Sequence, residues 1–305
     1  MPVVLPDVST IRRAVEYAGR APSIHNSQPW RWVAGPDGVD LFADPDPQLA
    51  AADPDGRDLL LSCGAALHHL LVALAGLGFS ARVERFPDPE DPTHLARIRP
   101  QDTAPSPGAV RLAGAIGRRH TDRRRFGSRP VDRAVLDTLG RAAVGWGADL
   151  HVVGPGDAHR RLIEILGRGA SLQRQAEAYA AELARRTGEA APSARAGLRP
   201  PAHSVEHVDA AVLMVLSSRT DDRLGALRAG EATSAVLLVA TDQGLATTAL
   251  SRPLETARTR ASVAGQIVGA QLCPQLVLRV GWAQPGSPGL PPTPRRDLDE
   301  VLRTA

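Results

Sequence analysis

The sequence predicts an α+β protein made of two tandem α+β domains that pack as an intramolecular pseudo-dimer. Its 305 residues are enough for two domains of about 150 residues each. The segments 64–78 and 230–244 align without a gap, and each begins and ends with glycine. The Pro-rich segment 100–108 separates the two copies, so we predict domains at 1–108 and 109–305.

Both aligned segments have apolar residues at the spacing of one helix face, and the closing glycine is typical of a helix end. β-like runs follow them at 94–100 and 274–282. A second pair of matching blocks precedes them, with 19–21 and 31–36 corresponding to 140–142 and 150–155. Each half is therefore predicted to read helix, strand, long helix, strand. Because two blocks recur in the same order, we interpret them as an internal duplication rather than a chance likeness of Ala- and Leu-rich sequence.

Composition excludes several kinds of chemistry. All 36 basic residues are Arg, which rules out a Schiff-base lysine and a Walker-type phosphate lysine. The net charge of +3 is weak support for nucleic-acid binding, because arginine alone produces the basic balance. Cys63 and Cys273 have no metal or CxxC spacing, which predicts free thiols and no metal site. Residues 1–13 lack the apolar stretch of a signal peptide and no apolar run of about 18 residues occurs, so we predict a cytoplasmic protein that does not span a membrane.

The two halves differ in three segments. Residues 21–30, APSIHNSQPW, occur only in the first half, and the basic run 117–126, GRRHTDRRRF, occurs only in the second. The second half also carries an insert near 160–205, which begins with an amphipathic helical pattern and ends in a loop-like composition. Because each half keeps something that the other lacks, we expect one shared site at their interface, with the insert as a candidate lid.

Both special segments suit the binding of a small molecule. Segment 21–30 places short polar side chains between Pro22 and Pro29, which suits a heteroaromatic ring edge or a polyol chain. The alternative is a turn that satisfies the carbonyl groups at a helix C-terminus. In the basic run, Arg forks and the Thr121 hydroxyl at a predicted helix start favour phosphate, with a solvated basic face or a nucleic-acid patch as alternatives. Arg295 and Arg296 form a second candidate for holding an anion.

Together these segments resemble the nitroreductase family of FMN-dependent oxidoreductases. The run 21–30 is similar to the family's signature A-P-S-x-x-N-x-Q-P-W, and 118–123 is similar to its phosphate motif, with one extra residue before Phe126. The helix that ends at Gly244, the strand that ends at Gly281 and the arginines at 295–296 resemble its core helix, C-terminal strand and flavin-phosphate arginines. The reversed order of the two motifs resembles the Acg-type nitroreductase-like proteins, which are internal pseudo-dimers, and so does the pair His25–Asn26.

The resemblance implies a nitroreductase-like fold with one complete FMN site per chain, assembled from both halves. It places around the FMN phosphate the residues Arg119, His120, Thr121, Arg123, Arg295 and Arg296. It places along the ribityl chain and ring edges the residues Ser23, His25, Asn26 and Gln28. Leu250 and Ser251, followed by Arg252, would lie by the flavin N5 edge. No catalytic side chain is implied, because the flavin carries the redox chemistry.

The same resemblance implies an enzyme that passes hydride from NAD(P)H through flavin N5 to a quinone- or nitroaromatic-like acceptor. The alternative is a non-catalytic FMN-binding or FMN-sequestering protein whose insert closes the flavin site, and a third hypothesis is an Arg-rich nucleic-acid-binding protein. The favoured interpretation expects a small aromatic acceptor as partner, with no nucleic acid and no membrane. It also expects a monomeric pseudo-dimer or a weak homo-oligomer, because the chain already contains the interface.

Overall fold

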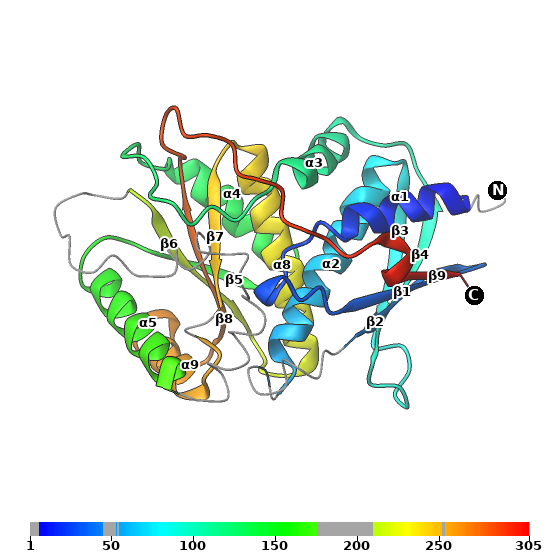
Figure 1. Cartoon of the computed structure of the whole chain (residues 1–305). Helices are drawn as coiled ribbons and strands as arrows, with labels where there is room; N and C mark the ends of the chain where they lie inside the picture. Colours follow the sequence, from blue (N-terminus) through cyan, green and yellow to red (C-terminus); the bar gives the residue numbers. More distant parts are fainter. Residues whose placement is uncertain (1–5, 45–52, 54, 176–209, 252–253, 305) are drawn as a thin grey trace.

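A computed structural model gives the structure of residues 6–44, 53, 55–175, 210–251 and 254–304. Two sheets stand on either side of a central pair of long helices, α2 (Arg57–Gly76) and α8 (Arg223–Asp242) (Figure 1). Both helices are buried on most of their surface, which explains why their sequences are apolar around nearly the whole circumference. The architecture is α+β, as the sequence predicts.

The other elements follow the chain from one sheet to the other. The first half also contains α1 (Val8–Ala18), the 3₁₀ turn η1 (Ile24–Asn26), β1 (Trp30–Gly35), β2 (Gly38–Ala43), β3 (Phe79–Arg85) and β4 (His94–Asp102). The second half contains α3 (Pro107–Arg118), α4 (Arg133–Val144), β5 (Asp149–Val153), α5 (Asp157–Gln175), β6 (Val212–Ser218), β7 (Ala246–Leu250), α9 (Ala257–Val263), the π-helical turn η4 (Ala264–Val268) and β8 (Cys273–Gly281). The chain closes with α10 (Leu298–Val301) and β9 (Leu302–Thr304).

Local sequence signals begin and end these helices. Asp7 caps α1 by accepting from the Thr10 N–H over 2.7 Å, and Asp222 caps α8 in the same way. After each long helix the chain reverses at a glycine with positive φ, +93° at Gly78 and +80° at Gly244. These two glycines are the closing residues of the aligned segments, so the predicted helix ends are confirmed.

The two halves have the same strand order. The sheets run β3-β4-β2-β1 and β7-β8-β6-β5, and every pairing within these two sets is antiparallel. The predicted strands at 94–100 and 274–282 are β4 and β8. The structure adds two strands to each half, β2 and β3 in the first and β6 and β7 in the second. Among these, β3 and β7 lie at sheet edges, where charged or short sequences give a weak strand signal.

One part of the predicted alignment is wrong. Gly19 is the C-cap of α1, but Gly140 lies inside α4, whose C-cap is Gly145. The second half then passes from helix to strand over 145–149, whereas the first half uses 19–30. The additional residues of the first half are the APSIHNSQPW loop. The predicted junction at 100–108 is also shorter than expected, since β4 extends to Asp102 and α3 begins at Pro107.

The aligned glycines Gly64 and Gly230 lie where α2 and α8 cross. A Cβ atom on Gly64 would stand 2.0 Å from the Leu227 carbonyl oxygen, and one on Gly230 would stand 2.1 Å from the Leu61 carbonyl oxygen. The two helix backbones therefore touch with no side chain between them. Because equivalent positions of the repeat meet each other, the crossing is consistent with a pseudo-twofold axis between the halves.

Each long helix also begins with an arginine at the same place in the repeat. Arg57 of α2 donates to the carbonyl oxygen of Gln275 in β8, and Arg223 of α8 donates to the carbonyl oxygen of Pro92, just before β4. Each guanidinium thus reaches from one half to the backbone of the other. These reciprocal contacts, the shared strand order and the crossing glycines support the proposal of an internal duplication.

Replacing Gly230 with alanine is expected to lower the free energy of unfolding by about 3 kcal/mol, because the new methyl group would overlap the Leu61 carbonyl and push the helices apart. Chemical denaturation measures the loss. Gly140→Ala is the matched control, since a Cβ there meets nothing within 4 Å, and it should raise stability by about 0.5–1 kcal/mol. Equal stability of Gly230→Ala and the wild type would contradict the backbone contact.

After β8 the chain returns to the first half. Strand β9 pairs in parallel with β1, with Leu302 opposite Trp32, and the red C-terminal segment lies beside α1 and β1 in Figure 1. Val301 and Leu302 join the core of the first half, as do Ala115 and Ile116 of α3. The domain boundary at residue 108 stays a prediction. The hydrophobic core of the first half includes residues from both ends of the predicted second domain, 109–305.

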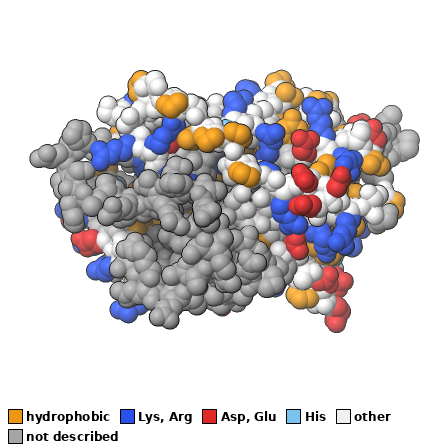
Figure 2. All heavy atoms as spheres, viewed as in Figure 1, with side chains coloured by type: hydrophobic (Ala, Val, Ile, Leu, Met, Phe, Trp, Pro, Cys, Tyr) orange, Lys and Arg blue, Asp and Glu red, His pale blue; other side chains and the backbone are white. Residues whose placement is uncertain are grey.

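The insert begins as predicted, with α5 placing Leu162, Ile165 and Leu166 in a core with β6 and β8. Residues 176–209, and with them most of the candidate lid, lie outside the described residues. Helices α2 and α8 are long and apolar enough to cross a membrane by length and composition alone, but most of each is buried inside the protein, as in core helices. Over the first half, acidic and basic side chains lie side by side on the face shown in Figure 2. The cytoplasmic location stays a prediction.

Candidate functional site

The end of α3 places a buried arginine against the first half. Arg119 is the C-cap of α3, and only 6% of the residue is exposed. Its Nη2 donates to the Arg20 carbonyl oxygen over 3.1 Å, while its Nε and Nη1 have no hydrogen-bond partner among the described residues. Burial, with a contribution from the nearby Arg295, lowers the pKa of Arg119 to about 10.

Arg295, which follows the Pro-rich C-terminal loop, lies against the same carbonyl group. Its Nη2 is 3.3 Å from the Arg20 carbonyl oxygen, and its Nη1 donates to Asn26 Oδ1 and to the Pro294 carbonyl oxygen, each over 3.0 Å. Its Nε is buried and without a partner in the described part of the chain. Burial, followed by the charge of Arg20, lowers the pKa of Arg295.

The two guanidiniums form a cationic pair, Arg119–Arg295, in which Arg119 is buried and Arg295 is half-buried. Neither side chain makes an ion pair with a described residue, and three of their buried nitrogen atoms have no acceptor there. Burying an unneutralised charge is costly, and buried donors are almost always bonded. Such a pair therefore indicates a site for an anion, because phosphate and carboxylate groups match the guanidinium fork.

The loop 21–29 carries Asn26 to this pair. Its backbone has positive φ at three non-glycine residues, 52° at His25, 58° at Asn26 and 50° at Gln28. Ser23 Oγ ties the loop by accepting from the Gln28 N–H over 3.0 Å. Left-handed non-glycine residues are unfavourable by themselves and cluster where surrounding contacts fix the chain, often at functional sites. The loop is thus held in one shape, and this shape places Asn26 Oδ1 against Arg295.

Gln28 and Arg296, also predicted site residues, contact each other beside the pair. Gln28 Oε1 accepts from the Arg296 backbone N–H over 2.9 Å. The Arg296 guanidinium binds Asp44 Oδ2 over 2.8 Å, so it is neutralised by a carboxylate, unlike that of Arg295. These contacts join the loop 21–29 to the C-terminal segment and hold Arg295 in place.

The chain that follows Arg119 runs alongside β7. The Asp122 N–H donates to the Thr247 carbonyl oxygen over 2.8 Å, and Thr121 forms a parallel bridge with Thr247. The Asp122 carboxylate binds the Arg124 guanidinium over 2.7 Å. Thr121 is thus held beside β7, two residues after the buried Arg119.

The prediction that this motif opens a helix is wrong, because α3 ends at Arg118 and the next helix begins only at Arg133. The negative end of the α3 dipole instead favours the cations that follow it. His120 Nδ1 lies 2.8 Å from the Arg118 carbonyl oxygen, and Arg123 is exposed. Of the motif, the structure buries Arg119 in the site and leaves His120 bonded to its own neighbour.

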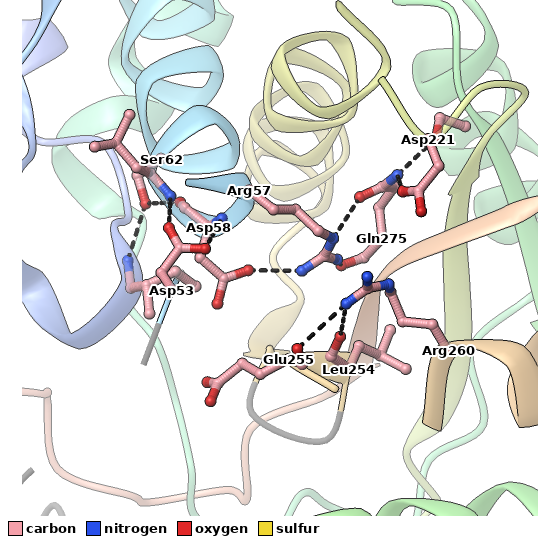
Figure 3. Close-up of polar contacts among 12 residues, drawn as sticks. Asp53, Arg57, Asp58, Ser62, Asp221, Leu254, Glu255, Arg260 and Gln275 are labelled. Atoms are coloured by element: carbon pink, nitrogen blue, oxygen red, sulfur yellow. Dashed lines mark hydrogen bonds and ion pairs between the residues drawn. The ribbon is translucent and has the colours of Figure 1, made fainter. Parts of the chain in front are cut away.

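A second buried polar cluster lies at the N-terminus of α2 (Figure 3). Arg57 Nε donates to Gln275 Oε1 over 2.9 Å, and its Nη1 binds Asp58 over 2.7 Å. Arg260 donates to the carbonyl oxygens of Leu254 and Glu255. Burial lowers the pKa of Arg57, while the charge of Asp58 opposes this effect. Unlike the cationic pair, this cluster carries its own carboxylate.

Asp58 connects this cluster to the loop 21–29. Its carbonyl oxygen accepts from Ser62 Oγ over 2.8 Å, and the same hydroxyl oxygen accepts from the Ile24 N–H over 3.1 Å. Burial raises the pKa of Asp58 to about 6, even though Arg57 acts in the opposite direction. The N-terminal part of α2 thus fixes one side of the loop that bears Asn26.

The predicted N5-edge residues lie at the end of β7 that is remote from Thr247. Leu250 is the last residue of the strand, and the Ser251 carbonyl oxygen accepts from the Leu254 N–H over 2.8 Å. They therefore adjoin the Leu254–Glu255 part of the second cluster in Figure 3. Arg252 lies outside the described residues.

A buried ion pair joins α8 of the second half to β3 of the first half. Glu231 of α8 is fully buried and accepts two hydrogen bonds from Arg85 at the end of β3, 2.7 and 2.9 Å long. In the aligned repeat, the residues that correspond to Glu231 and Arg85 are Ala65 and Ser251. The repeat thus has small residues at 65 and 251, where the equivalent positions 231 and 85 carry a bulky ion pair.

The fold and this site define a protein of two like α+β halves with one buried, unneutralised cationic site between them. Comparison with known proteins shows its kinship. The chain is 44% identical over 319 residues to "Putative NAD(P)H nitroreductase Rv3131" of Mycobacterium tuberculosis, covering 97% of this chain and 92% of the relative. It is 38% identical over 326 residues to "Putative NAD(P)H nitroreductase acg" of the same organism, covering 99% and 98%. The chain belongs to the nitroreductase family, which confirms the resemblance.

No protein-family model matches the chain. Among solved structures, an FMN-bound nitroreductase from Bacteroides fragilis has a TM-score of 0.42 and 13% identity, and covers 60% of this chain and 94% of its own. The FMN and NADPH-dependent nitroreductase NfnB from sphigopyxis sp. strain HMH has a TM-score of 0.44 and 19% identity, with 63% and 97% covered.

The structure separates the predicted site residues by place. Arg295 binds Asn26 and shares the Arg20 carbonyl oxygen with Arg119, while Ser23, Gln28 and Arg296 hold the surrounding chain. His120 lies against the Arg118 carbonyl oxygen. Thr121, Arg123, Leu250 and Ser251 follow β7, and His25 supplies part of the strained loop. Sequence reasoning missed Arg57, Asp58 and Glu231. Arg57 has a signal in the sequence, because it and Arg223 hold the same place in the two repeats.

Proposed function

We propose that the chain binds FMN between its two halves and acts as an NAD(P)H-dependent oxidoreductase on flat quinone- or nitroaromatic-like acceptors. The observation that carries this proposal is the cationic pair Arg119–Arg295, which makes no ion pair with the described residues. Membership of the nitroreductase family, with relatives named for NAD(P)H nitroreductase activity, supports the choice of cofactor and reductant.

The residues of the site fit the phosphate of FMN. Arg119 Nε and Nη1 and Arg295 Nε are buried donors without acceptors among the described residues, and phosphate oxygens are strong acceptors. Thr121 and Arg123 follow Arg119 in the same segment, and Thr121 is bridged to Thr247 of β7. Asn26 Oδ1 accepts a hydrogen bond from Arg295 and so holds this guanidinium in the site. The loop of the first half therefore completes a site whose positive charges come from the second half.

When bound, FMN supplies the hydride transfer between NAD(P)H and the acceptor. The protein supplies binding and orientation. Leu250 and Ser251 would bound the ring edge, and the Arg57–Asp58 cluster holds the loops on either side of it. Cys63 is fully buried, and burial raises the pKa of its thiol, which disfavours the nucleophilic thiolate form. Among the described residues, no three His, Cys, Asp or Glu side chains gather to hold a metal ion.

The ion pair Arg85–Glu231 supports one flavin site per chain. It puts two bulky charged side chains at the positions equivalent to Ala65 and to Ser251, the proposed ring-edge residue, which leaves less room for a ring at the equivalent place. The symmetry-related half also lacks an arginine motif equivalent to 118–123. We therefore propose a stoichiometry of one FMN per chain.

Flavin reduction by NADPH tests the proposed function. The purified protein should be yellow, and anaerobic NADPH should bleach the bound flavin, which a quinone then reoxidises. A yellow protein that dithionite bleaches and NADPH does not would contradict the enzyme and support an FMN-sequestering role. A colourless protein that takes up no added FMN, and whose affinity for DNA falls steeply with salt, would contradict flavin binding.

A further inference from the structure

His69, a fully buried residue of α2, has one ring nitrogen that the described residues leave unbonded. Its Nδ1 lies 3.0 Å from the Ala65 carbonyl oxygen and 2.7 Å from Ser234 Oγ. Its Nε2 has no hydrogen-bond partner among the described residues. A buried polar atom without a partner is rare in proteins and calls for a ligand or a water.

The contacts of Nδ1 fix which nitrogen carries the proton. The Ala65 carbonyl oxygen can only accept, so Nδ1 is the donor and Nε2 presents a lone pair. Ser234 agrees with this assignment, because its hydroxyl can donate to His68 Nδ1, 2.6 Å away, while it accepts from His69. His69 is thus an acceptor at Nε2.

Several groups keep His69 neutral. Burial lowers its pKa well below the ordinary value, and the positive charges of Arg119 and Arg295 act in the same direction. His68 also lowers it, and only the Ala65 carbonyl raises it. His69 lies two turns after Ser62 on the same face of α2, and Ser62 Oγ accepts from the Ile24 N–H of the loop that carries Asn26 to the cationic pair. This face of the helix therefore runs along the site, in agreement with the effect of the two arginines on the ring.

We propose that His69 Nε2 accepts a hydrogen bond from a hydroxyl group on the carbon chain next to the ligand's phosphate. This inference rests on the proposed function, in which that chain is the ribityl chain of FMN. A phosphate oxygen is excluded as the partner, because a dianion has no proton to donate and would face the Nε2 lone pair. The two guanidiniums already balance the charge of a phosphate dianion. His69 Nε2, a neutral acceptor beside them, therefore needs a donor from another part of the ligand, and a hydroxyl group supplies one.

His68 provides a matched control on the same helix. It is buried and bonded to the same Ser234, but its ring meets the edge of Trp146 in the second half, 4.5 Å away between centroids. Burial alone lowers its pKa, to about 3, without a contribution from Arg119 or Arg295. A substitution there disturbs the same packing without removing the acceptor.

The test compares three flavins: FMN, riboflavin, which lacks the phosphate, and lumiflavin, which also lacks the ribityl chain. His69→Leu should weaken FMN and riboflavin by the same factor, about five- to tenfold, since it removes one neutral hydrogen bond to the shared chain. Its affinity for lumiflavin should not change. His69→Gln, whose amide oxygen can replace the acceptor, should recover most of the loss, and His68→Leu should leave the riboflavin-to-lumiflavin ratio unchanged.

Other results would overturn the inference. If His69→Leu weakens the binding of FMN alone, His69 contacts the phosphate. Equal losses of affinity for all three flavins would show that His69 has a structural role. No loss of affinity would show that it has no role in binding. If the variants do not fold, calorimetry of wild-type FMN binding at pH 8 in two buffers decides: no proton uptake is expected, and uptake of a proton would contradict the neutral acceptor. If the wild type binds none of the three flavins, the proposed function itself fails.

Discussion

Replacing Arg85 with methionine is expected to lower the free energy of unfolding by about 3–5 kcal/mol, because it leaves the Glu231 carboxylate buried and unpaired. The Glu231 side chain is fully buried, while 21% of the Arg85 side chain is exposed. Glu231→Leu should therefore cost less, about 1–2 kcal/mol, since the guanidinium left behind can turn toward water. Urea denaturation of both variants measures the difference.

The loss in Arg85→Met should depend on pH. Burial raises the pKa of Glu231, and Arg85 is the main group that opposes this effect. Without Arg85 the folded-state pKa rises further above the unfolded value, so the folded protein takes up a proton more readily than the unfolded chain. Stability of the variant therefore increases as the pH falls through the folded-state pKa, and the deficit relative to the wild type should be smaller at pH 5 than at pH 8.

The double variant Arg85→Met with Glu231→Met is the control. Replacing a buried ion pair by apolar residues of similar volume is often neutral or stabilising, so the double variant should recover most of the loss. A double variant as unstable as Arg85→Met would show that packing, not the unpaired charge, causes the effect. Recovery would also show that this contact between the halves does not require charged residues.

The sequence could predict much of the fold because the two long helices carry their signals locally. Gly64 and Gly230 open the aligned segments, and Gly78 and Gly244 end the helices in positive-φ turns. The helix contact at Gly64 and Gly230 and the positive φ at Gly78 and Gly244 require glycine, so both halves have glycine at these positions and the repeat can be seen in the sequence. The strands β3 and β7 were missed because edge strands need only one partner, and their short or charged sequences have no buried face on both sides.

The site was predictable as two segments but not as a set of contacts. The motifs identified the loop 21–29 and the run that contains Arg119, and both reach the interface. Arg295 and Arg296 are adjacent and chemically alike, yet of the two only Arg296 meets carboxylates, those of Glu300 and, at 2.8 Å, of Asp44 just after β2. No local pattern distinguishes them, because the partner is set by the return of the C-terminal segment to β1. The same holds for His69, whose role depends on Arg119 from the other half.

Replacing Arg119 with leucine is expected to weaken FMN binding by at least about 100-fold, since charge-assisted hydrogen bonds to phosphate contribute about 1.5–3 kcal/mol each and Arg119 has two unbonded donors among the described residues. Riboflavin, which has no phosphate, should bind the variant as it binds the wild type. The ratio of the two affinities, measured by quenching of flavin fluorescence, isolates the phosphate contribution. Arg118→Leu is the control, because Arg118 is next to Arg119 in the sequence but its guanidinium is exposed and lies 3.7 Å from the Asp242 carboxylate.

The same substitution should stabilise the protein without cofactor. Arg119 is a buried cation beside another cation, Arg295, and neither makes an ion pair with the described residues, so removing one charge relieves both desolvation and repulsion. We expect the free energy of unfolding of the cofactor-free protein to rise by about 1–2 kcal/mol, while the FMN-loaded variant loses the stabilisation that tight binding gives the wild type. If the substitution raises the free energy of unfolding without FMN and lowers it with FMN, the positive charge of Arg119 serves cofactor binding. A variant less stable in both states, with riboflavin weakened as much as FMN, would show instead that Arg119 holds the fold.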